Sequence, residues 1–194
     1  MIIGICGLIG SGKGTVADIL VEEHGFKKLS FADSLKDGVA AMFDWPRHLL
    51  EGDTEESREW REKSDTFWTE ETGREISPRL VLQLVGTECM RQGFYDGVWV
   101  SLAKKKLVRF PTQNWVIPDT RFPNEINMIH SVGGTIWRVK RGADPDWFES
   151  LREKNIIPTD VHPSEYEWVR SEFDQVIENE GTLEDLRNQI LSRL

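Results

Sequence analysis

The chain has 194 residues and a formal net charge of −9, with 29% charged and 39% hydrophobic residues. This acidic balance argues against general nucleic-acid binding, which needs a basic face to neutralise phosphates, and no apolar run approaches the roughly 18 residues of a membrane span. Because no Pro/Gly/Ser-rich linker divides the sequence, we expect one domain over 1–194, in a cytoplasmic protein.

The first predicted strand, Ile2 to Cys6, leads into the glycine-rich stretch Gly7-Leu8-Ile9-Gly10-Ser11-Gly12-Lys13-Gly14-Thr15. A loop of this kind turns its backbone N–H groups inward around a polyphosphate, and the helix predicted over about 13–24 adds a partial positive charge. We expect Lys13 to reach the β- and γ-phosphates and Thr15 to contact Mg2+, directly or through water. The G-K-G-T form of this phosphate loop resembles that of nucleoside monophosphate kinases.

A second strand is predicted at Phe26 to Phe31, so that strand, loop, helix and strand imply a right-handed crossover and a parallel sheet. A helix begins just after Phe31, at the edge where ligands of open α/β sheets bind. Residues 44–76 are polar and acidic with isolated tryptophans, which we interpret as loops and short helices over the substrate side of the site.

Ser77 and Pro78 predict the start of another helix, with Ser77 as its N-cap. Arg79 in the first turn of that helix is unfavourably placed for the helix dipole, which hints at a phosphate partner. A further helix is expected around Trp99 to Lys106. Its basic end at 104–109 is typical of a solvated helix C-terminus.

The third strand, 115–119, ends in Asp119, where phosphate-loop enzymes place a carboxylate that holds Mg2+ or its waters. Arg121 and Glu125 follow at the same edge. Arg121 is also four residues from Glu125, so the two side chains are alternatively a simple helical ion pair.

The fourth strand, 135–139, is followed by Arg141 at the sheet edge and by a second polar excursion, 142–168, which we interpret as lid-like. A fifth strand at 175–177 and a helix capped by Thr182 complete the pattern. Together these elements predict an α/β fold of three layers, α/β/α, around a five-stranded parallel sheet, as in P-loop kinases. Cys6 and Cys89 are expected to be small buried residues.

The assembled motifs resemble the deoxynucleoside monophosphate kinase family of tailed bacteriophages. The resemblance is carried by five blocks that span nearly the whole chain: 7–15; 31–36; 77–79 continuing into 83–88; 118–121 with Glu125; and 179–186. It implies transfer of the γ-phosphoryl group of ATP to the 5′-phosphate of a deoxynucleoside monophosphate, with Mg2+, in the host cytoplasm if the protein is phage-encoded.

Residues of three kinds are expected, most of them by carry-over from this family. The catalytic residues are Lys13, Arg121 and Arg141. Arg141 is chosen from the chain itself, because strand alternation puts only one of Arg138 and Arg141 at the site and Arg141 lies nearer the sheet edge. The ATP-binding residues are Gly10, Gly12, Lys13, Gly14, Thr15 and Asn179, of which Thr15 shares the metal with Asp119. The acceptor-binding residues are Arg79, Gly86, Thr87, Trp99, Asp119, Arg121 and Glu125, with Lys36 and Arg74 as replacements for the Lys-Arg pair that other members carry where this chain has Ile9-Gly10.

Other classes stay open on the sequence alone. A kinase that phosphorylates a hydroxyl group would want a carboxylate base, and Asp33 is the obvious candidate for a nucleoside or small-metabolite kinase. Phosphomevalonate kinases share parts of the loop and strand-end pattern, and a non-catalytic nucleotide-binding module is a further alternative. Family members can form homodimers, which we keep as an expectation for this chain.

Overall fold

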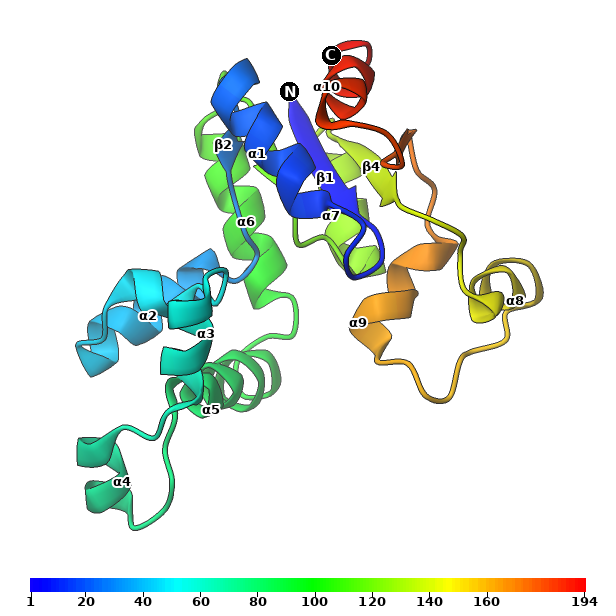
Figure 1. Ribbon diagram of the computed structural model, residues 1–194. Helices are drawn as coiled ribbons and strands as arrows, with labels where there is room; N and C mark the ends of the chain where they lie inside the picture. The colour runs from blue at the N-terminus through cyan, green and yellow to red at the C-terminus, as the bar shows by residue number, and fades with distance from the viewer. The chain divides into compact units, whose positions relative to one another are not determined.

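The computed structural model describes all residues from 1 to 194 and divides the chain into two compact units (Figure 1). The first unit consists of Met1–Phe31 and Ala103–Leu194, and the second of Ala32–Leu102. Helix α6 (Val98–Arg109) begins in the second unit and ends in the first. No helix combines the length and the apolar character of a membrane span.

A five-stranded sheet forms the centre of the first unit. Its strands are β1 (Ile2–Cys6), β2 (Lys27–Lys28), β3 (Trp115–Ile117), β4 (Thr135–Lys140) and β5 (Gln175–Glu178). They lie in the order β2-β3-β1-β4-β5, and every pair is parallel, which confirms the predicted sheet. With the phosphate-loop connection between β1 and α1 (Lys13–His24), this is the predicted α/β architecture.

Strand β2 is much shorter than the predicted 26–31. Leu29 still donates its N–H to the Val116 carbonyl at 2.9 Å, but the N–H of Phe31 is bonded at 3.2 Å to the carboxylate of Asp119 instead of to a neighbouring strand. The Asp119 carboxylate therefore accepts the N–H that the carbonyl of a neighbouring strand would accept in a longer ladder, and the strand does not extend to Phe31.

Helices cover both faces of the sheet. Strand residues alternate between the two faces, so Ile3 and Ile5 point to one side, where they pack with α1 and α10 (Leu183–Leu191) in one buried cluster. Helix α7 (Pro123–Ser131) lies against β1 and β4 and buries Ile126 and Ile129 (Figure 1). The result is the predicted three-layer arrangement.

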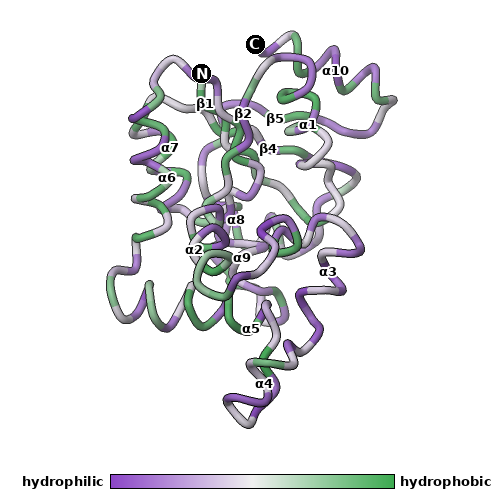
Figure 2. Tube along the Cα trace, turned by 90° about the vertical axis from the view of Figure 1, so that its left-hand side faces the viewer, coloured by the Kyte–Doolittle hydropathy of each residue, from purple (hydrophilic) through white to green (hydrophobic).

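The second unit is helical. Its elements are α2 (Asp33–Phe43), η1 (Arg47–Leu50), α3 (Glu55–Glu62), α4 (Thr66–Thr72), α5 (Pro78–Gln83) and the π-helix η2 (Leu84–Gln92). The short helices expected in 44–76 are present, but the tryptophans there build a core. Trp45 is buried with Val39 and Leu50, while Trp60 and Trp68 pack against this cluster. Helix α3 is hydrophilic along nearly its whole length (Figure 2).

One cysteine departs from expectation. Cys6 is buried in β1, as predicted, but Cys89 is exposed in η2, so the expectation of a buried residue there is wrong. The helical spacing around Cys89 does not reveal that the second unit places this turn at its surface.

The excursion 142–168 is packed onto β4 by one buried cation. Arg138 is only 8% exposed, forms an ion pair with Asp144, and lies over the ring of Phe148 with 4.2 Å from its guanidinium carbon to the ring centroid. The ring centroids of Trp168 and Phe173 each lie 5.8 Å from that carbon. The excursion contains α8 (Asp146–Lys154), α9 (Pro163–Tyr166) and the first half of η3 (Glu167–Arg170).

We expect Arg138→Met to lower the free energy of unfolding by about 3 kcal/mol, because it leaves the Asp144 carboxylate without its partner and removes the cation from the aromatic rings. Urea unfolding followed by tryptophan fluorescence measures this. Arg109→Met, at the exposed end of α6, is the matched control and should change stability by less than about 0.5 kcal/mol. Equal effects of the two substitutions would show that Arg138 does not anchor the excursion.

Candidate functional site

The glycine-rich loop connects the carboxyl end of β1 to the N-terminus of α1, as predicted. Gly10 and Gly12 have φ angles of 78° and 100°, a region that side chains rarely adopt, whereas Gly14 has joined the first turn of the helix. The hydroxyl of Ser11 is buried in this loop without a hydrogen-bond partner. The loop is therefore shaped by its glycines before any ligand is present, and its polar groups are available to one.

Asn179, which is predicted to bind ATP, connects the phosphate loop to the end of β4 through two hydrogen bonds. Its backbone N–H donates to the Lys140 carbonyl at 2.7 Å, and its side-chain amide donates to the Ser11 carbonyl at 2.9 Å. A Cβ atom on Gly12 would lie 2.2 Å from the same amide nitrogen. The observed contact of Asn179 is thus with the loop itself, and a contact with ATP stays a prediction.

Lys13 folds back onto the loop. Its ammonium donates to the carbonyls of Gly7 and Leu8, each at 2.8 Å. Burial lowers the pKa of Lys13, and the nearby charge of Arg121 lowers it further, while Cys6 and Glu165 act in the opposite direction. Two cations, Lys13 and Arg121, are therefore brought close together beside the phosphate loop, where an anionic ligand would relieve their repulsion.

Asp119 lies at the carboxyl end of β3, next to β1 in the sheet. One of its carboxylate oxygens accepts from the Ser30 hydroxyl at 2.6 Å and from the Phe31 N–H at 3.2 Å. Thr15 is exposed in the first turn of α1. Hydroxyl and carboxylate oxygens are donors that Mg2+ accepts, and Mg2+ in nucleotide sites takes one or two carboxylates plus phosphates and water.

Glu125 stabilises the backbone at the start of α7. It is 4% exposed, and its carboxylate accepts the N–H groups of Arg121 and Phe122 at 2.7 and 3.0 Å at the start of α7. This fixes the backbone that carries Arg121, whose side chain is exposed. The observed bonds of Glu125 are thus to the backbone of Arg121 and Phe122; an ion pair with the Arg121 side chain and a contact with substrate stay predictions.

Arg141 and Arg138 separate as strand alternation predicts. Arg138 is buried in the aromatic cluster, and Arg141 is exposed directly after β4. Sequence reasoning left out Glu165, whose charge raises the pKa of Lys13 and which therefore lies near the loop. Nothing in the spacing of the 142–168 excursion links it to the loop, because the link arises from the packing of the excursion on β4.

The expected acceptor residues of the second unit have partners of their own. Lys36 is paired with Glu51 at 2.6 Å, and Arg79 with Glu62. Gly86 is buried, and its carbonyl accepts from the Trp99 indole N–H at 3.0 Å. Arg74 and Thr87 are exposed. The structure thus brings Gly86 and Trp99 together, whereas Lys36 and Arg79 are held by different carboxylates.

The parallel sheet, the phosphate loop between β1 and α1, and the carboxylate at the end of β3 together define a nucleotide-binding protein of the P-loop kinase class. The family model for deoxynucleotide monophosphate kinase matches residues 51–190. The chain belongs to the deoxynucleotide monophosphate kinase family. It is accordingly a kinase of deoxynucleoside monophosphates, with ATP as the donor that this kinase family implies.

Two relatives agree with this assignment. A protein of Acanthamoeba polyphaga mimivirus, provisionally named a deoxynucleotide monophosphate kinase, is 32% identical over 99% of this chain and 95% of its own length. The deoxynucleoside-5′-monophosphate kinase of Escherichia phage T5 is 44% identical over 28% of this chain and 22% of its own. Among solved structures, the shikimate kinase of Aquifex aeolicus aligns over 100% of this chain and 95% of its own at 15% identity, with a TM-score of 0.47.

We expect Gly12→Ala to weaken ATP binding at least tenfold, because the new Cβ would collide with the Asn179 amide and is strained at a φ of 100°. Calorimetric titration with ATP and Mg2+ measures this. Gly38→Ala in α2 is the matched control: its Cβ meets nothing within 4 Å, so ATP affinity should be unchanged. Wild-type affinity in Gly12→Ala would contradict the description of the loop as preformed.

Proposed function

We propose that the first unit binds ATP at the phosphate loop and that the chain transfers the γ-phosphoryl group to the 5′-phosphate of the acceptor, giving ADP and a deoxynucleoside diphosphate. The observation that carries this assignment is the glycine-shaped loop between β1 and α1, in which the Lys13 ammonium is 2.8 Å from the carbonyls of Gly7 and Leu8. The charge of Arg121 also acts on Lys13 at this place. Both reactants are polyanions, so phosphoryl transfer asks mainly for positioning and for cations that neutralise charge.

In this proposal Lys13 leaves the carbonyls of Gly7 and Leu8 and binds the β- and γ-phosphates. The exchange is favourable because a charge-assisted bond to phosphate is stronger than a bond to a neutral carbonyl. Arg121 and Arg141, both exposed at the carboxyl edge of the sheet, neutralise the phosphoryl group in transfer. Gly10, Gly12 and Gly14 let the backbone approach the phosphates, as their positions in the loop and the first helical turn allow.

A phosphate acceptor agrees with the second unit as well. The second pKa of a phosphate monoester is about 6, so the acceptor is largely ionised at neutral pH and needs no general base. Asp33, the candidate base for a hydroxyl acceptor, is instead 3.5 Å from the guanidinium of Arg47 in an ion pair. Asp33 is therefore already engaged with a neighbouring cation, which supports a phosphate rather than a hydroxyl acceptor.

For the acceptor we propose the residues that the family resemblance implies. They are Lys36, Arg74, Arg79, Gly86, Thr87, Trp99, Asp119, Arg121 and Glu125. The two compact units would then serve one kinase domain, 1–194, in which 44–76 supplies acceptor contacts. The position of Glu165 near Lys13 supports a lid role for 142–168. Action in the host cytoplasm and formation of a homodimer complete the proposal.

We also propose that Mg2+ accompanies ATP, held through Thr15 and Asp119. When bound, the metal would neutralise phosphate charge. The contribution of the chain is to fix the Asp119 carboxylate, which the Ser30 hydroxyl and the Phe31 N–H do from β2 and its continuation.

The reaction class is tested by a coupled ADP-release assay with ATP, Mg2+ and each of the four common deoxynucleoside monophosphates in turn. We expect turnover with at least one monophosphate, and none with the matching free deoxynucleosides or with mevalonate phosphate. Turnover with a free deoxynucleoside alone would move the acceptor to a hydroxyl group and make Asp33 the residue to examine.

For Arg121 we expect the alanine variant to lower kcat more than tenfold without unfolding the chain, because an exposed cation is lost from the transferred phosphoryl group. The same change should raise the pKa of Lys13, since the positive charge of Arg121 lowers it. Steady-state kinetics and NMR titration of the lysine measure the two effects. Arg109→Ala should alter neither, and full activity of Arg121→Ala would remove Arg121 from the mechanism.

A further inference from the structure

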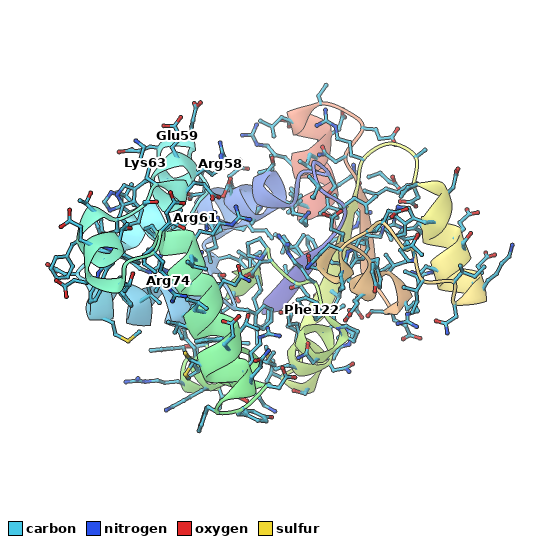
Figure 3. All side chains as sticks on the ribbon, turned by 90° about the horizontal axis from the view of Figure 1, so that it is seen from below. Arg58, Glu59, Arg61, Lys63, Arg74 and Phe122 are labelled. Carbon is cyan, nitrogen blue, oxygen red and sulfur yellow. The ribbon has the colours of Figure 1, made fainter.

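A cavity of about 490 Å³ in the second unit is lined mainly by cations. Arg58, Arg61, Lys63 and Arg79 face it together with only two carboxylates, those of Glu59 and Glu62. All but Arg79 come from α3 and its C-terminal end, and four of them are labelled there (Figure 3). The lining therefore has a positive balance in a chain whose net charge is −9. Its volume lies within the range typical of small-molecule sites.

Arg61 is held in place before any ligand arrives. Its guanidinium lies over Gly52, where a Cβ atom would be 2.2 Å from both Cζ and Nη2. The φ of Gly52 is 72°, so both the space and the backbone favour glycine there. One Nη donates weakly to the Glu51 carbonyl at 3.5 Å, and the buried Nε has no hydrogen-bond partner. The side chain is thus ordered while much of its donor capacity is unused.

Arg61 and Arg79 lie close enough to repel each other. Burial lowers the pKa of Arg61 and the charge of Arg79 lowers it further, with Glu62 acting in the opposite direction. Arg79 is paired with the Glu62 carboxylate, but this pair is weak because the two side chains are 63% and 55% exposed and water screens their charges. A dianion between the two guanidinium groups would replace this pair and remove the repulsion.

We propose that Arg61, together with Arg79, binds the 5′-phosphate of the acceptor nucleotide in this cavity. The inference rests on the proposed function, since it assigns the cavity to the acceptor of that reaction. Two planar guanidinium groups match the tetrahedral oxygens of a phosphate monoester through paired N–H donors, which an ammonium group does not provide. Arg61 thereby becomes a residue that decides acceptor affinity, and Gly52 the residue that positions it.

The test is steady-state kinetics of Arg61→Gln with the monophosphate varied at saturating ATP. We expect the KM for the monophosphate to rise at least tenfold while the KM for ATP stays within twofold. Arg61→Lys should restore only part of the loss. Gly52→Ala keeps the guanidinium but displaces it, so it should also raise the monophosphate KM. Arg91→Gln in η2 removes an arginine outside the cavity from the same unit and is the matched control.

Calorimetry without ATP provides the second measurement, with circular dichroism to confirm that each variant is folded. Wild-type protein should bind the monophosphate more tightly than the matching deoxynucleoside, and Arg61→Gln should lose most of that difference. An unchanged monophosphate KM and an unchanged phosphate-dependent affinity in folded Arg61→Gln would overturn the inference. If the wild-type chain phosphorylates no monophosphate, the proposed function fails instead, and the calorimetric difference still decides whether the cavity binds a phosphate monoester.

Discussion

The hydrogen bond from the Asn179 amide to the Ser11 carbonyl joins groups 168 positions apart in the sequence, and the shape of the phosphate loop depends on it. The sheet order makes this bond possible, because β4 lies between β1 and β5 and the Asn179 N–H bonds to Lys140 at the end of β4. Gly12 leaves the room that the amide occupies. The loop is therefore a product of the finished sheet, although its glycines are local.

Several cations of this acidic chain are bonded to groups of the chain itself. Lys13 is bonded to two loop carbonyls, Lys36 to Glu51, and Arg79 to Glu62. The partners of Lys13 and Arg79 are weaker than a phosphate dianion would be, because carbonyls are uncharged and the exposed Arg79–Glu62 pair is screened by water, whereas the Lys36–Glu51 pair is more enclosed. This arrangement keeps the cations ordered yet exchangeable, and ordered donors lose less conformational entropy when a ligand binds.

Local pattern predicted the five strands, the phosphate loop and the excursions, because each leaves a periodic or compositional signal. The local pattern did not predict the features that depend on contacts between residues far apart in the sequence. Strand β2 ends early because Asp119 takes the Phe31 N–H, and Trp45 is core because 44–76 folds onto α2 and α5. Cys89 is exposed for the same reason. Within the candidate site, the residues at strand ends were found from sequence. Glu165 was not, since its proximity to Lys13 follows from packing.

The anchoring of the 142–168 excursion decides which part of it is able to move. Arg138 ties Asp144 and Phe148 at one end and Trp168 at the other to β4. Between these ends, α9 has no buried residue, and segments with few buried contacts open at low free energy. Glu165 belongs to this segment and lies near Lys13, the cation that would bind the triphosphate in the proposed function. Under the proposed function, a nucleotide that engages Lys13 would compete with Glu165 for it, so the charge of the ligand would act on α9 while both ends of the excursion stay fixed.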